Sequence, residues 1–177
     1  MRLLAPGLCL VLSLALPATA QHMPSGSRPR AERHTGWRSQ LDAGERAMTE
    51  RNWDAAESAF VSVIDDARAA GDRGLLLARA LDGLADLRRE TGRLREAGEL
   101  YLESAELLER LLGPRQPRLA LTLHNLGVVY VEQERFDEAE APLERALLIF
   151  EEAMGADSPQ ADSTRQVLGV LESRRRD

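Results

Sequence analysis

Apolar residues recur every three or four positions along most of the chain from residue 37 onward, a spacing typical of amphipathic helices. Helix-stopping glycines such as Gly92, Gly113 and Gly155 separate several of these runs. Strict alternation of apolar and polar residues, which would indicate half-buried strands, is rare. The pattern therefore predicts an all-α fold with helices at about 37–50, 54–70, 74–91, 94–112, 117–133, 137–154 and 159–174.

The helical pattern repeats itself with a period of about 42 residues. The pair Leu126-Gly127 lies 42 residues after Leu84-Ala85 and 42 before Leu168-Gly169. A register that is kept over three units indicates a stack of similar helical hairpins. We therefore predict repeats at 37–70, 75–112 and 117–154, followed by a capping helix at 159–174.

Small residues occur where the two helices of each predicted hairpin would cross. Helices can approach closely only where side chains are small, and a large side chain of the partner helix then fills the space. The middle of each first helix and the start of each second helix carry Gly or Ala, and large residues stand on the second helices. The residues predicted to pack the repeats are Gly44, Ala56, Phe60, Ala85, Ala97, Tyr101, Gly127, Ala139, Ala146 and Gly169.

The third unit resembles a tetratricopeptide repeat. It reads Leu-His-Asn-Leu-Gly-Val-Val-Tyr, then Arg-Phe-Asp-Glu-Ala-Glu, then Glu-Arg-Ala-Leu. The long second helix and the Gly-x-x-x-Pro loop are similar to the 42-residue variety known from kinesin light chains. The resemblance implies a right-handed α-solenoid of about three hairpins plus a capping helix, and a scaffold for protein partners without catalysis. The first unit departs from the family, because Ala47 stands where an aromatic residue is usual.

The same resemblance implies that the first helix of each hairpin lines a concave surface. We expect this surface to form a groove for a peptide or a partner protein, lined by Arg79, Asp82, Asp86, Arg89, His124, Asn125, Val128 and Gln166. An alternative interpretation is that the charged members are solvated surface and that the apolar members pack on neighbouring helices.

The N-terminus has the pattern of a secretory signal peptide at 1–20. Arg2 precedes a short apolar run that ends before Ala18 and Ala20, which suit cleavage after Ala20. Residues 21–36 are predicted to be a disordered linker and 175–177 a tail. We expect a secreted or periplasmic protein; an uncleaved N-terminal membrane anchor is the alternative.

Composition narrows the function classes. Arginine supplies every basic residue, which suggests a GC-rich bacterial genome, and the net charge of −6 argues against nucleic-acid binding. The single cysteine, Cys9, lies in the apolar run, and the three histidines are scattered, so we expect no metal site and no cofactor. No catalytic motif or small-molecule site is apparent. We expect a monomeric, exported interaction module and no enzyme; a self-associating component of a cell-envelope assembly is the alternative.

The predicted cleavage site can be tested directly. Intact-mass and N-terminal analysis of the protein recovered from its native envelope should give a chain that begins at Gln21. A membrane-bound species that still begins at Met1 would instead establish the anchor.

Overall fold

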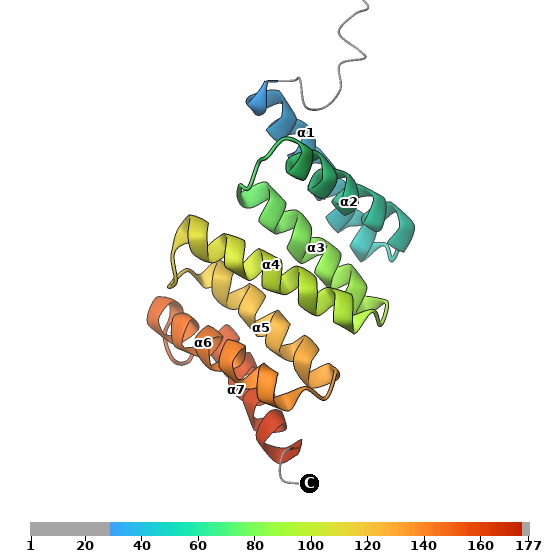
Figure 1. Ribbon diagram of the computed structural model, residues 1–177. Coiled ribbons are helices and arrows are strands. Elements are labelled where there is room, and N and C mark those ends of the chain that lie inside the picture. The colour runs from blue at the N-terminus through green and yellow to red at the C-terminus, as the bar shows by residue number, and fades with distance from the viewer. Residues whose placement is uncertain (1–28, 175–177) are drawn as a thin grey trace, which may run out of the picture.

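The structure, a computed structural model, describes residues 29–174, and these residues form α-helices without strands (Figure 1). The predicted signal peptide, most of the predicted linker and the tail at 175–177 lie outside the described residues. The helices are α1 (Arg30–Thr49), α2 (Trp53–Ala69), α3 (Leu75–Glu90), α4 (Leu94–Leu112), α5 (Pro117–Glu132), α6 (Phe136–Met154) and α7 (Pro159–Arg174).

The helices form three hairpins that stack along one axis (Figure 1). Helices α1 and α2, α3 and α4, and α5 and α6 pair within hairpins, and α7 packs on α6 and more lightly on α5. Further contacts join α1 to α3, α2 to α3 and α4 to α5. The result is a two-layered all-α solenoid, with α2, α4 and α6 in front in Figure 1 and the odd-numbered helices behind them.

A small residue on each first helix lies 16 positions before a large residue on the second helix. A Cβ atom at Gly44 would lie 2.7 Å from the ring of Phe60. One at Gly127 would lie 2.7 Å from Cδ2 of Leu143 and closer still to its Cγ. In the middle hairpin Ala85 and Tyr101 are fully buried in one cluster. Each hairpin is therefore closed by a side chain that packs against nearly bare helix backbone.

Phe60 also joins the first hairpin to the second. A Cβ at Gly83 of α3 would lie 2.6 Å from its ring, on which Gly44 of α1 also packs. Gly83 does not fall in the 42-residue register of small residues, so the repeat pattern gave no reason to single it out. The ring is almost wholly buried between the two glycines. The close approach of α1 and α3 to Phe60 therefore depends on both.

Gly169 departs from the expected packing pattern. It holds the position of Gly127 one repeat later, but it is exposed and nothing lies within 4 Å of a Cβ built there. The reason is that α7 is a first helix, and the described residues end before a second helix could pack on it. The other residues predicted to pack the repeats, among them Ala56, Ala97, Ala139 and Ala146, are fully buried.

Helix α1 begins at Arg30, whereas the sequence analysis started it at residue 37 and assigned 21–36 to a linker. The additional turns hold few apolar residues, but they contact the loop between α2 and α3. The Nε atom of Arg30 lies 3.2 Å from Asp72, and Nε2 of His34 lies 2.7 Å from it. Because Asp72 also accepts a hydrogen bond from the Gly74 backbone, it links the loop to the start of α1. Tertiary contacts therefore stabilise a segment with a weak amphipathic pattern.

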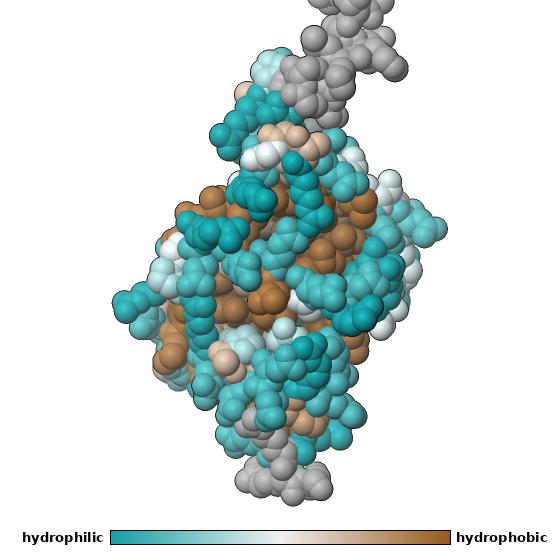
Figure 2. All heavy atoms as spheres, viewed as in Figure 1, coloured by the Kyte–Doolittle hydropathy of each residue, from teal (hydrophilic) through white to brown (hydrophobic). Residues whose placement is uncertain are grey.

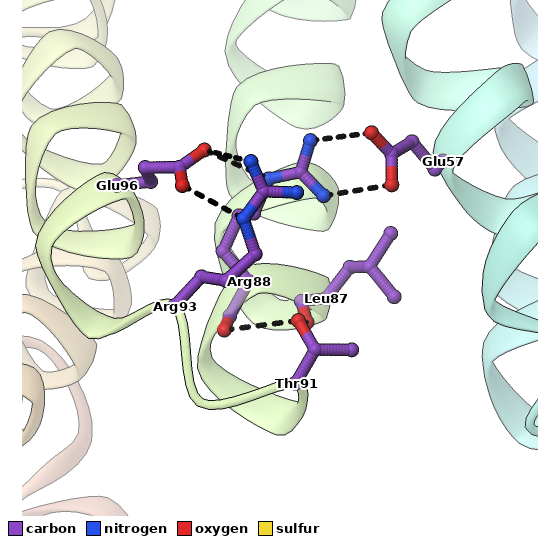
Figure 3. Close-up of polar contacts among 6 residues, drawn as sticks. All are labelled: Glu57, Leu87, Arg88, Thr91, Arg93 and Glu96. Carbon is purple, nitrogen blue, oxygen red and sulfur yellow. Dashed lines mark hydrogen bonds and ion pairs between the residues drawn. The ribbon is translucent and has the colours of Figure 1, made fainter.

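A buried arginine connects the three helices around the second hairpin (Figure 3). Arg88 of α3 donates two hydrogen bonds to Glu57 of α2, at 2.6 and 2.8 Å, and lies 3.3 Å from Glu96 of α4. The hydrogen bond with Arg88 is the main reason why the pKa of Glu57 is lowered. Removing either glutamate would leave a nearly buried charge with fewer partners, which is costly.

The two glycines of the 42-residue register give a matched test of the packing. We expect Gly127→Ala to lower the free energy of unfolding by about 1–3 kcal/mol, because the new methyl group overlaps Leu143. Gly169→Ala should raise it by roughly 0.5–1 kcal/mol, because the site is open and Ala favours the helix. Urea denaturation measures both. Equal shifts in the two variants would contradict the packing described here.

Candidate functional site

The odd-numbered helices line a groove of about 690 Å³. It extends from the C-terminal half of α1 across α3 and α5 to the start of α7, and α2 and α6 each contribute side chains. Its charged lining residues are Glu45, Arg79, Asp82, Asp86 and Arg118. Figure 2 shows the opposite layer, over α2, α4 and α6, where hydrophilic residues cover most of the surface and hydrophobic patches lie between them.

The apolar part of the groove is exposed to solvent. Leu121 of α5 is 53% exposed and Met154 of α6 is 49% exposed, although both side chains are large and apolar. A smaller cavity of about 200 Å³ adjoins the groove and shares Leu121, Phe150 and Gln160 with it. Sequence reasoning did not select Phe150 or Met154, because it assigned the groove to first helices only. The signal that it missed is the 19-residue length of α6, whose last turns reach the groove.

Arg79 is already bound within the chain. Its Nη2 donates to Asp42 and to Glu45 of α1, each at 2.7 Å, and its Nε donates to Glu45 at 2.7 Å. The hydrogen bond with Glu45 is the main reason why the pKa of Arg79 is raised. Arg79 therefore links α1 to α3 and has little capacity left for a carboxylate from outside.

Two further predicted groove residues make links of the same kind. Arg89 of α3 donates to Glu132 of α5 through Nε and Nη2, with a shortest distance of 2.7 Å. Nδ1 of His124 on α5 lies 3.0 Å from the Thr164 hydroxyl of α7. Burial, and to a lesser degree the charge of Arg89, lowers the pKa of His124, so the imidazole is neutral at pH 7. Successive first helices are thus joined by polar side chains along the concave layer.

Asp82 and Asp86 of α3 differ from these residues because hydroxyl groups are their closest partners. The Thr122 hydroxyl donates to Asp82 at 3.2 Å, whereas the Arg118 guanidinium is 4.0 Å away. Tyr101 donates its phenolic hydroxyl to Asp86. Burial raises the pKa of Asp82 to about 6, against the opposing effects of Ser104, Arg118 and Thr122. Burial also raises the pKa of Asp86, although Tyr101 and Arg89 act in the opposite direction.

The remaining predicted groove residues lie apart from this centre. Asn125 and Val128 of α5 are half-buried, and Gln166 of α7 is exposed. None of the three lines either cavity. His124 lines the smaller cavity, and Arg89 lines a neighbouring hollow together with Asp86. The structure therefore brings Arg79, Asp82 and Asp86 to one groove and disperses the others around it.

Residues 29–174 contain neither a metal site nor a membrane span. No three His, Cys, Asp or Glu side chains in this range are grouped so that they could hold a metal ion. Within the same residues, no helix has the length and apolar character needed to cross a membrane.

Comparison with known proteins gives consistent similarities. The family model of the tetratricopeptide repeat matches residues 76–152. A curated protein of Arabidopsis thaliana, "Protein KINESIN LIGHT CHAIN-RELATED 2", is 30% identical over 123 residues, which cover 68% of this chain and 18% of that protein. The chain therefore spans less than a fifth of the length of this relative.

Solved structures share the fold. The crystal structure of BtubC (BKLC) from P. vanneervenii matches with a TM-score of 0.71 at 23% identity, over 84% of this chain and 59% of that one. A Podosopora anserina kinesin light chain structure with nearly identical TPR-like repeats matches with a TM-score of 0.69 at 19% identity, over 85% of this chain and 68% of that one. At these identities the likeness concerns the arrangement of the helices.

The raised pKa of Asp82 makes a prediction about stability. Between pH 3.8 and about 6 the folded chain holds a proton that the unfolded chain releases, so stability falls as the pH rises through this range. Asp82→Asn removes the charge and keeps an acceptor for Thr122. At about pH 7 the variant should be more stable by on the order of 1–3 kcal/mol, and at about pH 4 the difference should vanish.

Urea denaturation at both pH values measures the difference between variant and parent. Asp65→Asn, an exposed site on α2, is the control and should change stability little at either pH. A destabilised Asp82→Asn variant at neutral pH would show that the ionised carboxylate is needed by the fold.

Proposed function

Because this chain belongs to the tetratricopeptide repeat family and has the kinesin-light-chain-like form of the repeat, we propose that it is an exported module that holds a peptide or a segment of a partner protein in its concave groove. The exposed apolar surface of the groove carries this proposal. Leu121 and Met154 stand open in a hollow formed by α1, α3, α5, α6 and α7, whereas most other large apolar side chains are buried. Exposed apolar surface in a concave site is typical of binding sites for other molecules.

The function proposed is binding and not catalysis. The imidazole of His124 is engaged by Thr164, and Asp82 and Asp86 accept hydrogen bonds from hydroxyl groups that are themselves buried. None of these residues pairs a nucleophile with a general base in the manner of a catalytic site. Helical hairpins of this family are commonly scaffolds for protein partners, which supports the same conclusion.

The export part of the proposal depends on the N-terminal sequence. The apolar run and the residues Ala18 and Ala20 support a secretory signal, and the module would then act outside the cytoplasm, as a monomer in the periplasm or the medium.

Self-association is the alternative, and one observation favours it. On α7 the surface around Gly169 is open, and Val170 beside it is 49% exposed. In the third hairpin the equivalent glycine receives Leu143 of the following helix. A helix from a second molecule could occupy the corresponding place on α7. Light scattering over a range of protein concentrations separates this alternative from a monomeric module.

The groove can be tested with two leucines of similar exposure. Peptides are first selected on the purified domain from a random displayed library. Leu121→Asp should weaken their binding at least about tenfold, because it places a charge in the apolar part of the groove. Leu148→Asp, at a leucine of α6 that is 60% exposed and lines neither cavity, should leave binding unchanged.

Circular dichroism and melting of both variants verify that they remain folded. Loss of binding in Leu148→Asp with full binding in Leu121→Asp would move the site to the layer of second helices. Failure to select any peptide that depends on Leu121 would refute the groove as a peptide site.

A further inference from the structure

The charges in the groove are unequal in sign once the internal pairs are taken into account. Arg79 is held by Asp42 and Glu45 at 2.7 Å, so its charge is already matched by two carboxylates. Arg118 is the other lining cation, and it lies 4.0 Å from Asp82. The groove and its immediate ion pairs therefore hold four carboxylates against two guanidinium groups, and the excess is negative.

The excess negative charge is concentrated at Asp82 and Asp86, one helical turn apart on α3. Neither carboxylate has a cation at close hydrogen-bonding distance, since Thr122 and Tyr101 supply hydroxyl groups and Arg89 is engaged by Glu132. Asp82 nevertheless lines the groove and keeps 21% of its side-chain surface exposed. A cation that enters the groove could therefore reach a carboxylate whose charge is poorly compensated.

Apolar surface and a further acceptor surround these carboxylates. Leu121, Phe150 and Met154 line the same groove from α5 and α6. The side-chain oxygen of Gln160 on α7, another lining residue, has no hydrogen-bond donor among the described residues. A ligand that suits this surface has N–H donors with positive charge next to a large apolar side chain.

From this complementarity we propose that the groove binds a peptide segment in which an arginine or lysine lies near a large apolar side chain, with the cation at Asp82 and Asp86 and the apolar side chain against Leu121, Phe150 and Met154. The proposal rests on the proposed function, since it names the chemistry of the segment that the groove would hold. It also predicts the opposite preference from a groove whose arginines are available, because Arg79 and Arg89 are bound to carboxylates of this chain.

Binding of a cation should also depend on pH in a defined direction. Asp82 is faced by Arg118 and Thr122 of α5, by Ser104 of α4 and by Asp86 of its own helix; Asp86 is faced by Tyr101 of α4, Glu45 of α1 and its neighbours Arg89 and Glu90. A bound cation favours the ionised carboxylates, so affinity should rise from about pH 5 to about pH 7 and then level off.

The test uses short amidated peptides of Gly and Ser that carry one Leu and one Arg at every spacing. Matched sets replace the Arg by citrulline, which keeps the shape without the charge, or by Glu. Fluorescence anisotropy with the domain should show Arg peptides binding at least about tenfold more tightly than their citrulline forms, and Glu peptides more weakly still. The double variant Asp82→Asn with Asp86→Asn should abolish the preference for Arg and the dependence on pH.

The control removes the same number of charges away from the groove. The double variant Asp65→Asn with Glu106→Gln changes exposed residues of α2 and α4 and should keep both the preference and the pH dependence. Equal binding of Arg, citrulline and Glu peptides, a preference for Glu, or an Arg preference that survives the loss of Asp82 and Asp86 would each overturn this inference. If displayed peptides still bind through Leu121 in any of those cases, the proposed function stands; if none does, both fail.

Discussion

The architecture depends on the close approach of helix backbones at a few positions without large side chains. Phe60 fits between Gly44 and Gly83, and Leu143 fits against Gly127. An added methyl group at any of the three glycines would meet carbon atoms within 3 Å, so the spacing of the helices has little tolerance there. Helix spacing in turn determines the curvature of the stack and the width of the groove between the first helices.

Polar contacts hold the concave layer in place after packing has brought the helices together. Arg79 joins α1 to α3, Arg89 joins α3 to α5, and His124 joins α5 to α7. Exposed ion pairs of this kind each contribute little to stability. Their main consequence concerns recognition, because a side chain that is bound within the chain is less available to a ligand.

The groove combines this internally matched charge with two features that the fold leaves unbalanced. One is the exposed apolar surface of Leu121 and Met154, and the other is the pair of carboxylates at Asp82 and Asp86. Each is less stable in the free protein than it would be with a suitable partner, the first through contact with water and the second through burial of charge. Binding sites are commonly placed where a fold keeps such costs.

Sequence alone determined the class of fold, since amphipathic spacing and the 42-residue period leave stacked helical hairpins as the arrangement that can bury every apolar face. It also located small residues such as Gly127 and Ala139, because close packing requires them at regular intervals. Only the tertiary structure decided which polar residues face one another, and so showed that Arg79 and Arg89 are paired within the chain. It likewise decided that α1 extends to Arg30 and that Gly169 is uncovered, because both depend on what lies beside a residue in space. Period and polarity describe one helix at a time, whereas partners, burial and desolvation belong to the assembled stack.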